Sequence, residues 1–439
     1  MIFNKYFLLF LHIFLGILFF HYNYLSTYYG LLIIVIGTYY ILKKSDLQVY
    51  YPVVFSAYII GLEVFLRMTR ASLFWEYGKY SIIYFILLGI IIQNKKTKFY
   101  LPALVYFILL IPAILYVPLN TIGEWRQYVA FNLSGPACLT ITSIYLYKRK
   151  INKLILGQIL FFMILPIISI SVYNILIMPN LDTYRFLPYS NATTSGGYGP
   201  NQVSTIFGLG ISCILIIEVL KIELFKRKII IYTLLAIFLI LGLLTFSRGG
   251  ILASLIAFLI AISYYFLVNQ KISHIIVKGL SILVISLATW NMVVNITDGV
   301  ISQRYGIGEE TDSENFFLDL TGRAKIYRID IEIFFDYFFT GSGLGQAKIL
   351  REKYGYGKQV TAHTEFSRML AEHGILGLFS LLIMFLILLK QLLSSKNSNI
   401  GYIKIFFGIL AILSMSHSAM RLAMSPFIFG FIFPEYKDL

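Results

Sequence analysis

The residues around Arg248 combine a cation with glycine in a way that suits the binding of an anion. Arg248 lies in the sequence TFSRGG at 245–250, between two apolar runs. A charge at membrane depth costs about 2.5 to 3.5 kcal/mol, and less near the interface, so it needs compensation. The glycines allow a sharp turn that leaves backbone amides open beside the guanidinium. The alternative on these residues alone is an arginine that reaches the lipid headgroups.

A second cationic stretch, GRAKIYR at 322–328, carries Arg323 and Arg328. It runs into apolar residues at helical spacing, which predicts a helix that lies at the membrane surface or packs on a helical bundle. A glycine-rich turn, GSGLG, follows at 341–345. The apolar positions are Ile326, Ile329, Ile333 and Phe334.

A third stretch, TAHTEFSRMLAEHG at 361–374, begins near His363. A neutral imidazole there could take a proton from a sugar hydroxyl, although an ordinary surface histidine is the alternative. The residues after it predict a helix that enters the membrane, with an apolar stripe and a separate polar side. Phe366, Met369 and Leu370 form the stripe, and Glu365, Arg368 and Glu372 form the polar side.

The segment 179–200 is rich in tyrosine, asparagine, threonine and serine, and it contains Arg185. Such side chains stack on sugar rings and hydrogen-bond to their hydroxyls, and they are also common in loops. The segment leads into GPNQ at 199–202, where the proline and Asn201 stand at the predicted start of a helix.

The composition places these stretches in a membrane protein. Hydrophobic residues make up 58% of the 439 and charged residues only 13%. The net charge of +15 comes from short basic clusters between apolar runs, so it does not indicate nucleic-acid binding. Cys138 and Cys213 both fall inside apolar runs, so neither a disulfide framework nor a thiolate metal site is indicated.

The apolar runs predict an all-α polytopic bundle of about 12 to 14 transmembrane helices that forms a single domain over residues 1–439. A spanning helix needs about 20 mostly apolar residues, because a backbone in hydrocarbon must satisfy its own hydrogen bonds. The expected spans are 6–21, 25–42, 49–66, 80–93, 99–117, 128–147, 153–178, 201–220, 229–246, 250–268, 274–294, 374–392, 400–418 and 422–434.

The basic clusters predict the orientation of this bundle. With both termini in the cytoplasm, the Lys- and Arg-rich loops near 43–44, 95–98, 148–150 and 226–228 are all cytoplasmic. The outer side then holds a shorter loop, 179–200, and a long, partly helical loop, 295–373. The inner loops are too short for a nucleotide-binding domain, and no phosphate-binding glycine loop precedes a Lys-Ser/Thr pair, so ATP-driven chemistry is disfavoured.

Arginine and lysine divide unequally between the two sides of this topology. The inner side holds 18 lysines and only 2 arginines, whereas the outer side holds 5 lysines and 11 arginines. The positive-inside rule treats both residues alike and does not predict this division. Because the planar guanidinium suits bidentate contact with phosphate, the outer arginines indicate a phosphate-bearing ligand. Pairing with loop carboxylates or lipid headgroups is the other interpretation.

Taken in order, these stretches resemble the O-antigen ligase and O-antigen polymerase superfamily of bacterial envelope glycosyltransferases. The resemblance covers about 195–420 and rests on GPNQ at 199–202, SRG at 247–249, GR at 322–323, the glycine turn at 341–345, and His363 with EHG at 372–374. In the family the histidine is commonly followed by asparagine, whereas Thr364 follows here.

The resemblance implies a GT-C-like enzyme in the bacterial inner membrane, with its active site on the periplasmic side and partly on the long loop. Its donor would be an undecaprenyl-diphosphate-linked oligosaccharide, used without nucleotide, metal or other cofactor. Arg248 and Arg323 would bind the diphosphate, and His363 would activate the acceptor hydroxyl. Arg185, Asn201, Arg328 and Glu365 are further candidates for contact with the glycan or the acceptor.

No metal-binding Asp-x-Asp pair occurs in the outer loops. Asp330 and Glu332 come nearest, and the intervening Ile331 indicates a helix face. The implied partners are membrane lipids, a chain-length regulator and a flippase, with no nucleic acid.

Three functions fit these features. We favour a polymerase that transfers the growing lipid-linked chain onto the next lipid-linked repeat. The second is a ligase that transfers the glycan to a lipid A core or to a protein hydroxyl. The third, from another class, is a lipid-linked oligosaccharide flippase or transporter, which is disfavoured because we find no internal repeat and only Glu63 as a clear charge within a helix.

Overall fold

The computed structural model describes residues 4–437 apart from 44, 46, 94–97, 119–121, 182, 269–272, 307–312, 358–361, 363 and 395–397. Within the helices, the side chains of 122, 273–278, 313–323, 398 and 399 are not described either. His363 therefore lies outside the described residues. Arg323 is described only as part of a helical backbone.

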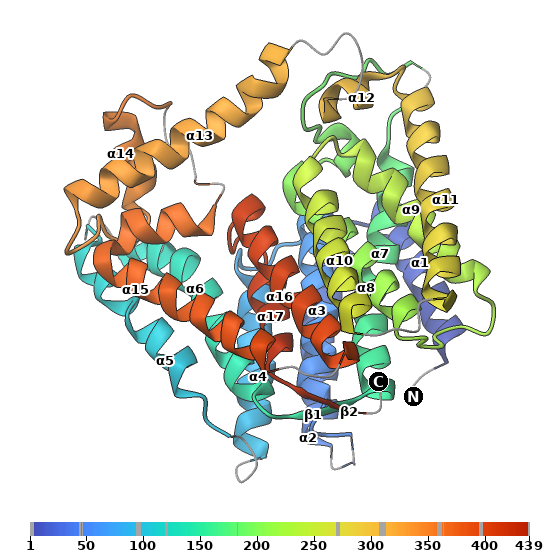
Figure 1. Ribbon diagram of the computed structural model, residues 1–439, viewed down its shortest axis with the longest axis horizontal. Helices are drawn as coiled ribbons and strands as arrows, with labels where there is room; N and C mark the ends of the chain where they lie inside the picture. The colour runs from blue at the N-terminus through green and yellow to red at the C-terminus, as the bar shows by residue number, and fades with distance from the viewer. Residues whose placement is uncertain are drawn as a thin grey trace.

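The described chain is a bundle of α-helices (Figure 1). The first half contains α1 (Lys5–His21), α2 (Leu25–Leu42), α3 (Tyr51–Met68), α4 (Tyr77–Ile92), α5 (Leu101–Ile108), the 3₁₀ helix η1 (Ile111–Tyr116), α6 (Ile122–Leu146) and α7 (Lys153–Ile177). The second half contains η2 (Thr193–Ser195), α8 (Pro200–Val219), α9 (Ile229–Leu244), α10 (Arg248–Val268), α11 (Ser273–Ile296), α12 (Val300–Tyr305), α13 (Ser313–Asp336), α14 (Gln346–Lys353), α15 (Glu365–Leu393), α16 (Ser398–Ser418), α17 (Met424–Phe429) and η3 (Gly430–Ile432).

The all-α polytopic class predicted from the sequence is confirmed. Among the described residues, nine helices are long and apolar enough to cross a membrane, and four shorter apolar helices accompany them. Two expected spans look different in the structure. The run at 99–117 is divided into α5 and η1, with Pro112 in the first turn of η1. The run at 422–434 contains only the short α17 and η3, whereas a full span needs about 20 residues.

One end of the bundle gathers both ends of the chain and the basic clusters at 148–150 and 226–228 (Figure 1). The Lys5 ammonium donates to the carbonyl of Glu223 at 3.0 Å, beside the cluster at 226–228. Strand β1 (Lys150–Asn152) pairs in parallel with β2 (Glu435–Lys437), which joins the C-terminal segment to the cluster at 148–150. Two of the clusters that the positive-inside rule assigns to one side, 148–150 and 226–228, therefore lie at the same end of the bundle.

The opposite end carries the two longer loops, with α12, α13 and α14 (Figure 1). Phe186, in the shorter loop, stacks on Phe246 with ring centroids 5.6 Å apart. The amide of Asn191 donates to the carbonyl of Thr245 at 3.0 Å. The loop 179–200 therefore packs on the turn between α9 and α10, which contains the SRG sequence.

Helices α8 and α10 come into close contact at two glycines. A Cβ placed on Gly208 would lie 2.3 Å from the carbonyl oxygen of Gly250, and one on Gly250 would lie 2.3 Å from the carbonyl carbon of Ser204. Small residues allow such contact between helices in membranes. The start of α8, with Asn201, is thereby fixed against the start of α10, with Arg248.

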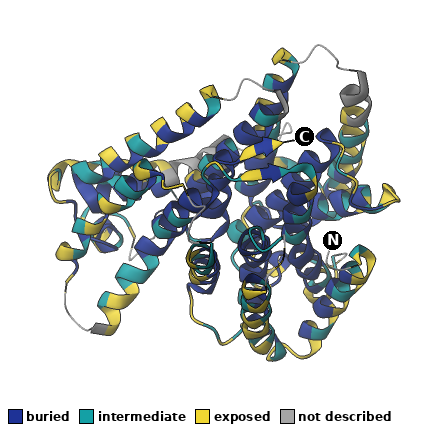
Figure 2. Cartoon of the chain, turned by 90° about the horizontal axis from the view of Figure 1, so that it is seen from below, coloured by how far each residue is buried: buried dark blue, intermediate teal, exposed yellow. Residues whose placement is uncertain are grey.

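Buried residues fill the interior of the bundle, and exposed residues lie on its outer faces (Figure 2). Many of these exposed residues are large and apolar. The apolar face predicted for the long loop is confirmed in α13, which packs on α15. Ile326, Ile329, Ile333 and Phe334 are all buried.

The two ends should be reached from opposite sides of a membrane, and cysteine labelling can check this. Cys138 and Cys213 are both 0% exposed, so the native chain should not react with a membrane-impermeant maleimide. Tyr189→Cys lies at the loop end, where Tyr189 is 57% exposed, and Arg227→Cys lies in a basic loop. We expect right-side-out vesicles to label only the Tyr189→Cys variant and inverted vesicles only the Arg227→Cys variant. Labelling of both from one side would contradict the arrangement.

Candidate active site

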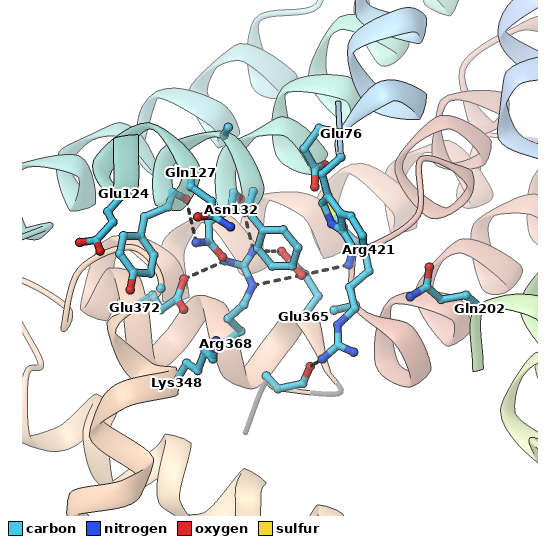
Figure 3. Close-up of a pocket in the computed structure, with 18 of the residues that line it drawn as sticks. Glu76, Glu124, Gln127, Asn132, Gln202, Lys348, Glu365, Arg368, Glu372 and Arg421 are labelled. Carbon is cyan, nitrogen blue, oxygen red and sulfur yellow. Dashed lines mark hydrogen bonds and ion pairs between the residues drawn. The ribbon is translucent and has the colours of Figure 1, made fainter. Parts of the chain in front are cut away.

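A cavity of 770 Å³ opens at the loop end of the bundle (Figure 3). Its walls come from the connection between α3 and α4, the start of α6, the glycine turn before α14, the start of α15 and the turn after α16. Segments from both halves of the chain therefore meet in it. Its charged lining residues are Arg67, Glu76, Glu124, Lys348, Arg351, Glu365, Arg368, Glu372 and Arg421.

Arg368 stands at the centre of this lining, between Glu365 and Glu372 (Figure 3). Its guanidinium forms ion pairs with both carboxylates, at 2.8 Å from Glu372, and donates to the side-chain oxygen of Asn132 at 2.8 Å. Spacings of three and four residues put the three charged side chains on one side of the helix, as the sequence predicts. The backbone amide of Met420 donates to Glu365 at 3.1 Å, so the cluster also binds the turn after α16.

The glycine turn at 341–345 docks on a kink in α15. The helix breaks at Gly374, which has φ +57°, and a Cβ on Gly341, at φ +67°, would lie 2.3 Å from the carbonyl oxygen of Glu372. The amide of Ser342 donates to the carbonyl of Ala371 at 3.0 Å, and that of Gly343 to the carbonyl of Glu372 at 3.1 Å. The turn thus satisfies carbonyls that the kink leaves open, and only glycine permits so close an approach. Two separate sequence motifs form one structural unit.

Asp330 joins α13, α14 and α15 beneath the cavity. Its carboxylate is fully buried and accepts from the Nε of Arg351 at 2.7 Å and from the hydroxyl of Ser367 at 2.6 Å. Burial raises the pKa of Asp330, and Arg351 opposes that shift. Its neighbour Glu332 instead faces outward and accepts from Arg328 at 3.1 Å.

Arg67 connects the first half of the chain to the GPNQ sequence. Its guanidinium lies 2.6 Å from Glu63 and donates to the side chain of Gln202 at 2.8 Å and to the carbonyl of Trp75 at 3.0 Å. Glu63 also accepts from the amide of Ala423 at 2.8 Å. Glu63, the charged residue that the sequence analysis placed within a membrane helix, is therefore one partner of a buried ion pair with Arg67.

Arg421, in the turn after α16, lines the cavity and donates to the carbonyl of Ala362 at 2.5 Å. Burial lowers the pKa of the Arg421 guanidinium, and the nearby charges of Arg368 and Arg351 lower it further, whereas Glu365 opposes the shift. The surroundings therefore disfavour this positive charge, and an anion in the cavity would favour it.

Arg248 is half-buried at the start of α10 and does not line this cavity. The turn that contains it does contact segments that lead to residues of the cavity. Its guanidinium donates to the carbonyl of Arg304 at 3.0 Å. The preceding Ser247 donates to the side chain of Asn201 at 2.8 Å, so the GPNQ and SRG sequences meet. A Cβ on Gly249 would fall 1.9 Å from Nδ1 of His417, which places this turn against the chain segment that leads to Arg421.

The other predicted residues lie elsewhere or are not described. Glu365 lines the cavity, whereas Arg185 and Arg328 are exposed and outside its lining. The side chain of Arg323 and all of His363 lie outside the described residues. Ala362 and Glu365, on either side of position 363, both line the cavity.

Sequence reasoning did not single out Arg67, Arg351 or Arg421 as site residues. A signal existed for two of them. Glu63 and Arg67 are four residues apart in an apolar helix, which is the spacing of an ion pair. Arg421 stands between two apolar runs, as Arg248 does.

The fold and the cavity define a polytopic helical membrane protein with an arginine-lined site at one end. Residues 231–382 match the family model described as O-Antigen ligase. This match contains Arg248, Arg323 and His363 and supports membership of the O-antigen ligase and polymerase superfamily, which implies a glycosyltransferase-like enzyme. No curated protein matches the chain.

The buried pair of Asp330 and Arg351 should stabilise the fold far more than the exposed pair of Arg328 and Glu332. Arg351→Ala leaves a fully buried carboxylate unpaired, which typically costs about 3 to 5 kcal/mol. Arg328→Ala, the matched control, removes a surface pair worth about 0 to 1 kcal/mol. We expect only Arg351→Ala to lower the unfolding temperature in detergent by several degrees. Equal effects of the two variants would contradict the structural role of Asp330.

Proposed function

We propose that this chain is an O-antigen polymerase in the bacterial inner membrane. It transfers an undecaprenyl-diphosphate-linked glycan onto the next lipid-linked repeat at the periplasmic face, with both termini in the cytoplasm. The observation that carries this proposal is the arginine-lined cavity, which lies at the end opposite the basic loops and adjoins the sequences of the family match. A chain-length regulator and a flippase would be its partners.

The proposed reaction breaks the bond between the anomeric carbon and the donor diphosphate. The acceptor hydroxyl forms the new glycosidic bond, His363 takes its proton, and the polyprenyl diphosphate leaves as an anion. We assign Arg248 and Arg323 to this diphosphate, so that they would stabilise the transition state, in which the negative charge develops, more than the ground state. The donor bond itself supplies the energy.

The cavity supports this chemistry through charge and position. Arg421 adds a cation and holds the carbonyl of Ala362, the residue before His363. Asp330 anchors α13, the helix that contains Arg323, against α14 and α15. Asn201 and Glu365 remain candidates for contact with the glycan or the acceptor, as do Arg185 and Arg328 of the outer loops.

A ligase is the second candidate, because the matching family model is described as O-Antigen ligase. Its acceptor would be a lipid A core or a protein hydroxyl. Purified protein, reconstituted with the lipid-linked repeat that a deletion strain accumulates, separates the two. A polymerase makes a ladder of lipid-linked products from the repeat alone, whereas a ligase reacts only when its acceptor is added. The absence of any turnover would favour a flippase.

Arg248→Ala, Arg323→Ala and His363→Ala should each abolish chain extension in this assay. Loss of one preorganised donor or of a general base typically lowers turnover about 10²- to 10³-fold. The matched control is Arg126→Ala, because Arg126 is an exposed arginine of α6 outside the cavity lining. Immunoblots of the membranes should show equal abundance. Full-length product from one of the three variants would exclude that residue from the site.

Arg421→Ala should lower kcat about 10- to 100-fold, because it removes a charge-assisted contact worth about 1.5 to 3 kcal/mol. Arg421→Lys should recover part of the loss, since an ammonium can also donate to the carbonyl of Ala362. Steady-state kinetics on protein of matched abundance measure both. Normal kcat in Arg421→Ala would show that this arginine acts on neither the diphosphate nor the His363 segment.

A further inference from the structure

A group of aromatic side chains lines the cavity beside its charged residues. We call Phe74, Trp75, Tyr80, Tyr128 and Phe131 the aromatic wall; they come from the connection between α3 and α4, from α4 and from α6. Phe74 is 54% exposed and Trp75 59% exposed, although both line a cavity. These rings therefore present apolar faces to the cavity.

Arg67 contacts both the ring and the backbone of Trp75 and holds it in place. The guanidinium lies 4.8 Å from the centre of the indole ring and also donates to the Trp75 carbonyl at 3.0 Å. Arg67 is itself fixed by Glu63 and Gln202. A ring held by a chain of such contacts loses less conformational freedom when a ligand stacks on it, so more of the stacking energy appears as affinity.

Polar side chains from α6 stand beside the aromatic wall. Figure 3 shows Glu124, Gln127 and Asn132 on this helix at the cavity. A carboxylate accepts hydrogen bonds and a side-chain amide both donates and accepts them. A sugar ring offers a matching surface, with an apolar C–H face for an aromatic ring and hydroxyls at its edge. The volume of 770 Å³ falls within the range of about 300 to 1,000 Å³ that is usual for ligand sites.

We propose that the aromatic wall is a sugar-binding subsite, in which one sugar of the lipid-linked glycan stacks on Trp75 while Glu124 and Gln127 bind hydroxyls of another sugar of the same glycan. The identity of that glycan rests on the proposed function, whereas the binding itself requires no catalysis. The subsite lies in the first half of the chain, outside the 231–382 match. The glycan would thus contact one half of the chain and its diphosphate the other.

Fluorescence can test the subsite without turnover. The chain has three tryptophans, at 75, 125 and 290, so Trp125→Phe with Trp290→Phe leaves Trp75 as the only indole. The probe is the free oligosaccharide released by mild acid from the lipid-linked repeat of a deletion strain. We expect a saturable change in Trp75 emission, and no such change with a chemically unrelated soluble oligosaccharide of equal size.

Kinetics provide the second measurement. Trp75→Ala should raise KM for the lipid-linked repeat about tenfold with little change in kcat, because stacking contributes to binding before the reaction. Trp75→Phe should restore most of the affinity. Tyr24→Ala is the matched control, since Tyr24 is an aromatic residue that is 61% exposed and lies outside the cavity lining.

The outcomes separate this inference from the proposed function. If wild-type protein extends chains but Trp75 does not respond to the oligosaccharide, the subsite is wrong and the function stands. If Trp75 responds but no lipid-linked repeat is turned over, the subsite stands and the polymerase is wrong. Quenching of Trp75 by lipids with brominated chains, without a response to sugar, would assign the ring to the aromatic belt at the membrane surface and overturn the inference.

Discussion

The structure of this site depends on the cost of removing charges from water. Arg368 and the two glutamates that flank it are buried, and a buried carboxylate or guanidinium is tolerated only when its hydrogen bonds are satisfied. One guanidinium cannot satisfy all the oxygen atoms of two carboxylates. The remaining bonds come from the backbone amide of Met420 and from that of Gly345, and Asn132 accepts from the guanidinium. A single buried cluster thereby fixes α6, α15, the glycine turn and the turn after α16.

The same compensation gives the cavity its electrostatic character. Arg67, Arg351 and Arg368 each have a carboxylate partner, which holds the guanidinium in one orientation and offsets its charge. Lys348 and Arg421 add further positive charge to the lining. Groups that are already oriented need no reorganisation when an anion forms beside them, and their effect is larger in a site that excludes water. The arginine-rich part of the cavity is therefore suited to a developing anionic charge.

The sequence predicts what is local and misses what depends on distant contacts. Spans such as α7 and α8 match within one or two residues, because hydropathy and helical period are local properties. The break between α5 and η1 was missed, although Pro112 removes a backbone donor there. Contacts between distant motifs, such as Ser247 with Asn201, were not predictable because spacing along the chain does not specify which loops meet. Arg67 and Gln202, 135 residues apart, show the same limit.

The long loop is anchored on the bundle beside the cavity, and several of its residues line that cavity. In α13, Arg323 stands seven residues before Asp330, which corresponds to about 10 Å along the helix axis. Asp330 is buried against α14 and α15, so the position of Arg323 follows from a contact two turns away. On the other side, Arg421 holds Ala362 and Arg368 holds Glu365, and these two residues flank position 363. Arg351, Arg368 and Arg421, which form these contacts, all line the cavity. A change in the charge of the cavity would therefore affect both the helix that contains Arg323 and the segment around position 363.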